Sequence, residues 1–199
     1  MTRSCRLSLL SAVALALACS SPTSRFYTLA PTVPADLSAH AALAIGVGPV
    51  EIPSAVDRPQ FVLQVAPNRV TLHEYHRWAA PLGEAIAQTV AADLSALLGT
   101  PDVVPLPAPG FRYDLRVTLD VQRFESVPDQ RVEIDAVWSV HDSADPAGMR
   151  SGRTVAQEPV EGRDVEALAA AHSRALGQLS RRIAQAIQAE MPSRESPKK

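Results

Sequence analysis

A cysteine near the N-terminus carries the clearest chemical signal in this 199-residue sequence. Arg3 and Arg6 precede an apolar run, and Ala16-Leu17-Ala18 stands directly before Cys19. A basic start, an apolar stretch and small residues before a cleavage point are typical of a secretory signal peptide. A cysteine just after the cleavage point can accept a diacylglyceryl group on its thiol and a further acyl chain, such as palmitate, on its amine. We therefore predict a lipidated Cys19 that follows a cleaved signal peptide, residues 1–18.

Two other interpretations of this segment stay open. An ordinary signal peptide cleaved near Ala18 would leave Cys19 as a free thiol. A membrane-spanning helix is disfavoured because the apolar run from Leu7 to Ala18 is shorter than the roughly 20 residues that a span requires. Ser20, and not an aspartate, follows the cysteine, which resembles the outer-membrane sorting signal of enteric-type bacteria. We expect a lipid-anchored protein on the periplasmic face of the outer membrane.

The remaining sequence offers little that points to catalysis or metal binding. His73 and His76 form the one close histidine pair, and we expect their spacing, in a strand-to-loop region, not to place both on one face. Cys5 leaves with the signal peptide, so no second cysteine completes a zinc site. Asp114 and Asp120, six residues apart in a strand, would lie about 20 Å apart, too far for a glycosidase carboxylate pair. We predict no enzyme, no metal site and no cofactor beyond the covalent lipid.

Length and charge set further bounds. The chain has 19 basic and 21 acidic side chains, and loss of Arg3 and Arg6 with the signal peptide widens the acidic excess to four. This balance disfavours nucleic acid as a partner. After the signal peptide, the length suits one domain. We predict a lipidated cysteine and short tether at 19–25, one domain at 26–190 and a disordered tail at 191–199.

Two short motifs are richer in functional groups than plain packing requires. One is Asp57-Arg58-Pro59-Gln60, and the other is Arg77-Trp78. An arginine beside a tryptophan can stack, bridge a carboxylate or anchor an interface. In the structural alternative, which the residues alone favour, Asp57 pairs with Arg77 to fix a turn against the start of a helix, and Trp78 joins the core. The motifs are thus candidates for partner binding or for structure.

The elements that must position these motifs follow from hydrophobic periodicity. An apolar stripe at three- and four-residue steps predicts a helix at 81–98 that ends before Gly99, and Asp164 is a suitable N-cap for a second helix. A slip in the alternation at Arg123-Phe124 indicates a bulge. Strands are expected at 26–29, 43–50, 61–65, 70–75, 103–104, 113–121, 132–140 and 153–157. This order predicts an α+β fold, with two helices packed on one face of a mostly antiparallel sheet.

A family resemblance rests on these same residues. The sequence is similar to the ABC-type transport auxiliary lipoproteins (PqiC/YmbA-like). The motifs that carry this likeness are Phe26-Tyr27-Thr28-Leu29, Ile45-Gly46-Val47-Gly48-Pro49-Val50 with Ile52-Pro53, Asp57-Arg58-Pro59-Gln60, and Arg77-Trp78-Ala79-Ala80-Pro81-Leu82. The resemblance implies a non-enzymatic subunit of an MCE-type system, which carries lipids between the inner and outer membranes. It implies an MCE-domain transport protein as the partner.

Two points stay open beside that resemblance. A lipoprotein that assembles or scaffolds an envelope complex, without a lipid-transport role, is the alternative, and a periplasmic hydrolase is a weaker one. Assembly into a homo-oligomer is possible.

Overall fold

The computed structural model describes residues 22–35, 42–145 and 149–194, so Cys19 and the predicted signal peptide lie outside the described residues. One sheet has three strands in the order β1 (Arg25–Tyr27), β4 (Arg69–Trp78) and β3 (Gln60–Ala66). The other has five, in the order β5 (Val103–Pro105), β2 (Ile45–Glu51), β6 (Leu115–Val127), β7 (Arg131–Asp142) and β8 (Met149–Pro159). The helices are α2 (Leu82–Leu98) and α3 (Val165–Arg194). Within the described ranges, neither helix is apolar enough over a sufficient length to cross a bilayer.

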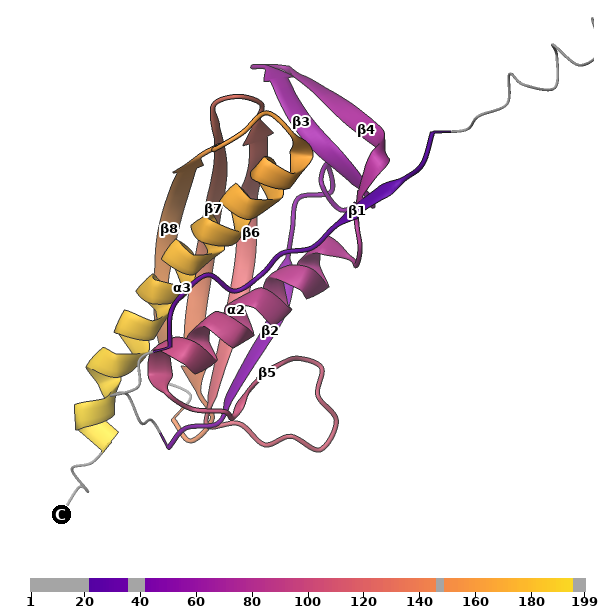
Figure 1. The fold of residues 1–199 in the computed structure, drawn as a ribbon. Coiled ribbons are helices and arrows are strands. Elements are labelled where there is room, and N and C mark those ends of the chain that lie inside the picture. Colours follow the sequence, from indigo (N-terminus) through magenta and orange to yellow (C-terminus); the bar gives the residue numbers. More distant parts are fainter. Residues whose placement is uncertain (1–21, 36–41, 146–148, 195–199) are drawn as a thin grey trace, which may run out of the picture.

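The predicted α+β architecture is confirmed, with a correction to the sheet. Both helices pack on the same face of the five-stranded sheet, with α2 over β2 and β5 and α3 over β7 and β8 (Figure 1). The strands, however, form two sheets, and both sheets are mixed. Strand β1 runs parallel to β4, and β2 runs parallel to both β5 and β6. These pairs are not joined by tight hairpins, and only a longer connection lets two strands run in the same direction.

The helix α2 follows the apolar stripe that predicted it. Ile86, Val90 and Leu94 are fully buried, and they face the five-stranded sheet. The helix ends at Gly99, which adopts a left-handed conformation with φ of 63°. Glycine adopts this left-handed conformation at little energetic cost because it has no Cβ atom. Gly99 therefore ends the helix at the predicted place.

The helix α3 also begins where the sequence indicated. The Asp164 carboxylate accepts a hydrogen bond from the backbone N–H of Ala167 at 2.8 Å, as an N-cap residue does. The face of the helix that carries Leu168, Leu176 and Ile183 is buried. The helix extends to Arg194, so it includes the first residues of the tail that we placed at 191–199. Residues 195–199 lie outside the described part of the chain.

The hairpin of β6 and β7 confirms the strands predicted at 113–121 and 132–140. Alternate side chains of both strands are buried beneath the helices. The register shifts between Val121 and Arg123, which gives β6 one extra residue at the predicted slip. The shift also changes which side chains face the core, so Phe124 points inward and contacts α3.

His172 of α3 occupies the centre of this core. Its ring stacks on Phe124 with ring centroids 3.9 Å apart, and its Nε2 shares a 2.7 Å hydrogen bond with the hydroxyl of Ser126. Phe61 and Trp78 also pack around it. Complete burial lowers the pKa of His172 to about 3, so the ring is neutral in the folded protein. His172 therefore serves the packing of the core.

This buried histidine makes the fold sensitive to acid. The unfolded chain takes up a proton on His172 near its ordinary pKa of 6.5, whereas the folded chain does so only near 3. The folded state therefore loses stability as the pH falls below 6.5, by about 2 kcal/mol at pH 5 from this group. Urea unfolding of the native chain and of His172→Phe at pH 7.5 and pH 5 measures this loss. The variant should lack that component, and equal pH dependence in both proteins would contradict the assignment.

Candidate functional site

The two sequence motifs lie side by side in the structure. Strands β3 and β4 pair so that Gln60 faces Arg77, and the backbone N–H of Trp78 donates to the carbonyl of Pro59 at 2.8 Å. Asp57, Arg58 and Pro59 lie just before β3 and are exposed. The strand pairing thus joins both motifs into one cluster at the end of the three-stranded sheet.

Within this cluster, Trp78 serves the core. Its side chain is 6% exposed and stacks on Phe61 with ring centroids 4.4 Å apart. It also meets Phe124 of β6 edge to face, with ring centroids 6.1 Å apart. Because Phe61 belongs to the small sheet and Phe124 to the large one, Trp78 joins the two sheets. The prediction of Trp78 as a core residue is confirmed.

Arg77 has a different partner from the one that the structural alternative gave it. Among the described residues no ion pair joins Asp57 to Arg77, and the Arg77 Nε donates instead to the carbonyl of Glu74 at 2.9 Å. The Gln60 amide holds the Glu74 carboxylate at 3.3 Å. Asp57 and Arg58 are exposed to solvent, so their charges are available to bind another molecule.

The segment that follows β1 ties the N-terminal part of the chain to the helices. We name residues 28–33 the strap. Figure 1 shows the strap, in indigo, running from β1 across the helices α2 and α3. Before the strap, the Tyr27 carbonyl accepts the backbone N–H of Ala79 at 2.9 Å. The strap is therefore continuous with the strand that completes the three-stranded sheet.

A buried carboxylate on α2 holds the strap. Asp93 accepts hydrogen bonds from the backbone N–H groups of Thr32 at 3.1 Å and Val33 at 3.4 Å. Its second oxygen accepts the hydroxyl of Ser180 on α3 at 3.1 Å. Burial raises the pKa of Asp93, and the hydrogen bonds from Val33, Ser180 and Thr32 oppose that rise. Asp93 thus links the strap to both helices at one point.

Small residues on α3 let the strap approach closely. A Cβ atom on Gly177 would lie 2.5 Å from the Thr32 hydroxyl, which is closer than atoms in van der Waals contact. The Ser173 hydroxyl accepts the backbone N–H of Ala30 at 3.1 Å, and the Ser173 carbonyl accepts the Thr32 hydroxyl at 3.3 Å. Ser173, Gly177 and Ser180 recur at helical spacing, so they form one narrow face of α3.

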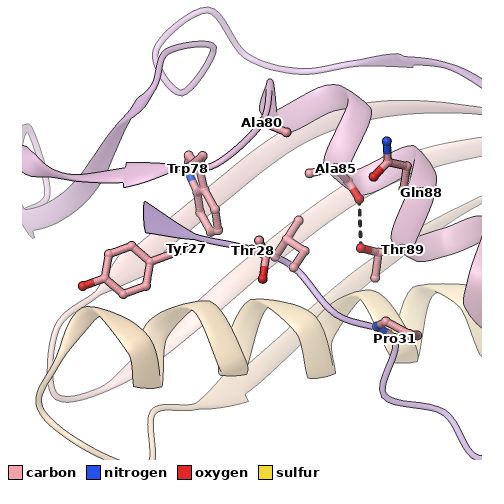
Figure 2. A pocket seen from close by; sticks show the side chains of 9 residues that line it. Tyr27, Thr28, Pro31, Trp78, Ala80, Ala85, Gln88 and Thr89 are labelled. Atoms are coloured by element: carbon pink, nitrogen blue, oxygen red, sulfur yellow. Dashed lines mark hydrogen bonds between the residues drawn. The ribbon is translucent and has the colours of Figure 1, made fainter. Parts of the chain in front are cut away.

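Figure 2 shows a pocket between the start of the strap and the first turns of α2. Its volume is about 240 Å³. Trp78 forms one wall, and the Thr89 hydroxyl is turned back to the Ala85 carbonyl at 2.8 Å. The lining residues are Tyr27, Thr28, Leu29, Pro31, Trp78, Ala80, Ala85, Gln88 and Thr89. Apart from the Tyr27 phenol none of them is ionisable, so the pocket suits an uncharged contact and supplies no acid–base pair.

The histidine pair differs from our expectation. Strand β4 carries three extra residues between its pairings with Phe61 and Gln60, and this irregularity brings the rings of His73 and His76 to 5.2 Å. The Tyr27 hydroxyl shares a 2.6 Å hydrogen bond with the His76 Nδ1. Burial, His73 and Arg25 lower the pKa of His76. No third metal-ligating residue joins the pair in the described part of the chain.

A carboxylate pair on the open face of the five-stranded sheet is structural. Glu133 bonds to Arg123 and, at 2.6 Å, to Gln157. Asp135 accepts two hydrogen bonds from Arg153, at 2.8 Å and 2.6 Å. Burial alone would raise the pKa of Glu133, but these partners hold it below its ordinary value, and Arg153 does the same for Asp135. Both acids stay ionised, as needed for ion pairs and not for proton donation.

Sequence reasoning missed the residues that hold the strap. A signal was present, because Asp93 lies three residues after Val90 on the apolar stripe of α2, where a carboxylate needs buried partners. The spacing of Ser173, Gly177 and Ser180 was a second signal, since small residues at helical intervals permit a close approach. Neither signal identified residues 28–33 as the segment that fills this space.

Asp93 should contribute strongly to stability. Asp93→Ala leaves two backbone N–H groups and one hydroxyl without their acceptor, so we expect a loss of about 3 kcal/mol in the free energy of unfolding. Asp93→Asn keeps one acceptor oxygen and should lose about a third as much. Urea unfolding gives both values, with Gln88→Ala, an exposed change on the same helix, as the control. An Asp93→Ala variant as stable as that control would show that the strap is not held there.

Comparisons with known proteins support the fold and give the family. A crystal structure of an uncharacterized protein superposes with a TM-score of 0.68 at 19% identity, over 83% of this chain and 99% of that one. A crystal structure of a protein from Xanthomonas campestris gives 0.70 at 18% identity, over 86% of this chain and 100% of the other. At these identities the likeness concerns the fold. No curated protein matches this chain.

The family model of the ABC-type transport auxiliary lipoprotein component matches residues 27–184. That span begins in β1 and ends in the buried part of α3, so it includes both motifs, the strap and Asp93. The family consists of transport auxiliary lipoproteins and is not an enzyme family. By this match, the chain belongs to the ABC-type transport auxiliary lipoprotein family, as its sequence motifs indicated.

Proposed function

We propose that this chain is an outer-membrane-anchored lipoprotein subunit of an MCE-type lipid transport system. In this role a lipid on Cys19 holds the domain at the periplasmic face of the outer membrane. The domain there docks the MCE-domain protein that spans the periplasm, and so supports lipid movement between the membranes and envelope integrity. Membership of the transport auxiliary lipoprotein family supports the role of a transporter subunit.

The observation that carries this proposal is the short connection between Cys19 and the fold. The described part of the chain begins at Pro22, three residues after Cys19, and β1 begins at Arg25. Six residue steps from Cys19 to Arg25 reach at most about 21 Å. Since β1 pairs with β4 and the strap is held by Asp93, the folded domain cannot move far from the lipid. A partner must therefore come to the membrane surface, as a periplasm-spanning protein does.

The exposed motif supplies a docking site for that partner. Asp57 and Arg58 present opposite charges in solvent beside the rigid pairing of Gln60 with Arg77. Trp78 beneath them is fixed in the core, so the turn is held in one place. Preorganised charges of this kind favour a specific partner because little order has to be gained on binding.

The alternative is a lipoprotein that assembles or scaffolds an envelope complex without a lipid-transport role. It would use the same anchor and the same exposed motif, and self-assembly into a homo-oligomer suits either role. Identification of the captured partner separates the two. An MCE-domain protein supports transport, whereas a β-barrel or cell-wall protein supports scaffolding.

The anchor itself is tested by Cys19→Ser. Without the thiol, the diacylglyceryl group has no acceptor, so the variant should leave the outer-membrane fraction while its circular dichroism stays native. Mass spectrometry of the native N-terminus should show the acylated cysteine. A native N-terminus without acyl groups, or a Cys19→Ser variant that fractionates as the native protein does, would contradict the anchor.

Docking is tested by a pull-down from envelope extract with the lipidated protein. The Asp57→Ala/Arg58→Ala double variant removes both exposed charges and should reduce capture of the MCE-domain protein about tenfold, as loss of a contact worth about 1.4 kcal/mol does. Glu161→Ala/Arg163→Ala is a matched control, since it also removes one exposed acid and one exposed base. Equal capture by the two double variants would remove the motif from the interface.

A further inference from the structure

We propose that the three-stranded sheet makes a second, non-covalent contact with the bilayer. The contact is a patch of Phe26, Tyr75 and Arg77, which rests in the phospholipid headgroup layer. This inference depends on the proposed lipid anchor at Cys19, and it assigns the face of the domain that turns toward the membrane.

The patch exposes unusually large side chains. The Phe26 side chain is 64% exposed and Tyr75 is 47% exposed, although both lie within strands. Phe26 pairs with Arg77 across β1 and β4, so an arginine stands beside the exposed phenylalanine. A single exposed apolar residue needs no explanation, but two aromatic residues and an arginine close together on one small sheet indicate a contact surface.

Phe26 and Arg77 lie on one side of the sheet, with the exposed Tyr75 near them on β4. His76 stands between Tyr75 and Arg77, and it turns inward to bond the Tyr27 hydroxyl. Trp78, on the other side of Arg77, is buried, so Arg77 lies between two inward side chains and points outward. Tyr75 lies in the irregular stretch of β4 before His76, and its ring is exposed to solvent. The Tyr27 ring contacts the buried Phe61, so it faces the core. The side chain of Phe26, the preceding residue of the strand, points to the opposite side of the sheet. The patch therefore faces away from the core.

The position of the lipid decides what covers this patch. Phe26 is seven residues after Cys19, a distance of at most about 25 Å. A lipid fixed in the bilayer keeps Phe26 close to the membrane surface, and the fixed pairing of β1 with β4 brings Tyr75 and Arg77 with it. Such tethering raises the effective concentration of the surface around the patch, so even a weak contact is populated.

The chemistry of the patch suits the headgroup layer. Aromatic side chains prefer the boundary between lipid tails and water, where an apolar ring and a polar edge are both satisfied. Arg77 can bind a lipid phosphate with its guanidinium while its carbon chain lies along apolar neighbours. The bond from its Nε to the Glu74 carbonyl fixes the direction of that guanidinium.

Met149, an exposed apolar residue of the five-stranded sheet, is poorly placed for this contact. Met149 is 54% exposed, but it begins β8 at the end of the five-stranded sheet away from the three-stranded sheet (Figure 1). With the patch on the membrane, that end is directed into the periplasm. Phe26 and Met149 thus make a matched pair for an experiment, because they are similarly exposed but are expected to lie at different distances from the bilayer.

Tryptophan fluorescence in vesicles tests the inference. Phe26→Trp, Tyr75→Trp and Met149→Trp are prepared as full-length, lipidated proteins and placed in phospholipid vesicles whose acyl chains are brominated near the headgroup. Bromine quenches indole emission on contact. The native Trp78 and Trp138 are 6% and 8% exposed, and the emission of the parent protein is subtracted to remove their signal.

We expect the added emission of Phe26→Trp and Tyr75→Trp to be mostly lost on bromination and that of Met149→Trp to be retained. Adding Arg77→Gln to Phe26→Trp should weaken the quenching. Equal emission from all three variants in brominated and plain vesicles would overturn the membrane contact and leave the patch to a protein partner. Flotation of the same samples keeps the two proposals distinct, because a protein that does not float with vesicles lacks the anchor itself.

Discussion

The structure depends on the way in which the N-terminal part of the chain is built into the fold. Strand β1 extends the three-stranded sheet by pairing with β4, and the strap after it is held between α2 and α3 by the buried Asp93. A lipoprotein domain on a long tether can turn freely, whereas here few residues separate the fold from Cys19. Attachment of a lipid at Cys19 therefore constrains both the distance of the domain from the membrane and its orientation.

A single aromatic core makes this constraint effective. Phe61 and Trp78 of the small sheet pack with Phe124 of the large sheet and His172 of α3, so the two sheets cannot move independently. The exposed Asp57 and Arg58 are adjacent to this core, as is the strand that carries Phe26. The proposed membrane contact on one side of the small sheet and the proposed partner contact at its end would thus be held in a fixed relation.

Local signals in the sequence predicted the elements well and their partners poorly. The stripe of α2, Gly99 and the Asp164 cap depend on residues a few positions apart, and the structure confirmed them. The parallel pairing of β2 with β6 and the hydrogen bond from Thr32 to Asp93 join residues about 60 to 70 positions apart. Hydrophobic periodicity reports only on neighbouring positions, so it predicted neither these contacts nor the division into two sheets. For the same reason the sequence placed Trp78 in the core but gave Arg77 the wrong partner.

Amide hydrogen exchange of the lipidated protein on vesicles tests the central claim most directly, because it reports whether the strap is part of the folded core. The amides of Thr32 and Val33, which donate to Asp93, should be protected to nearly the same extent as the amides of β6 and β7. Exchange of these two amides at the rate of an unstructured chain, with β6 and β7 still protected, would mean that the lipid is attached through a free tether and would contradict the account.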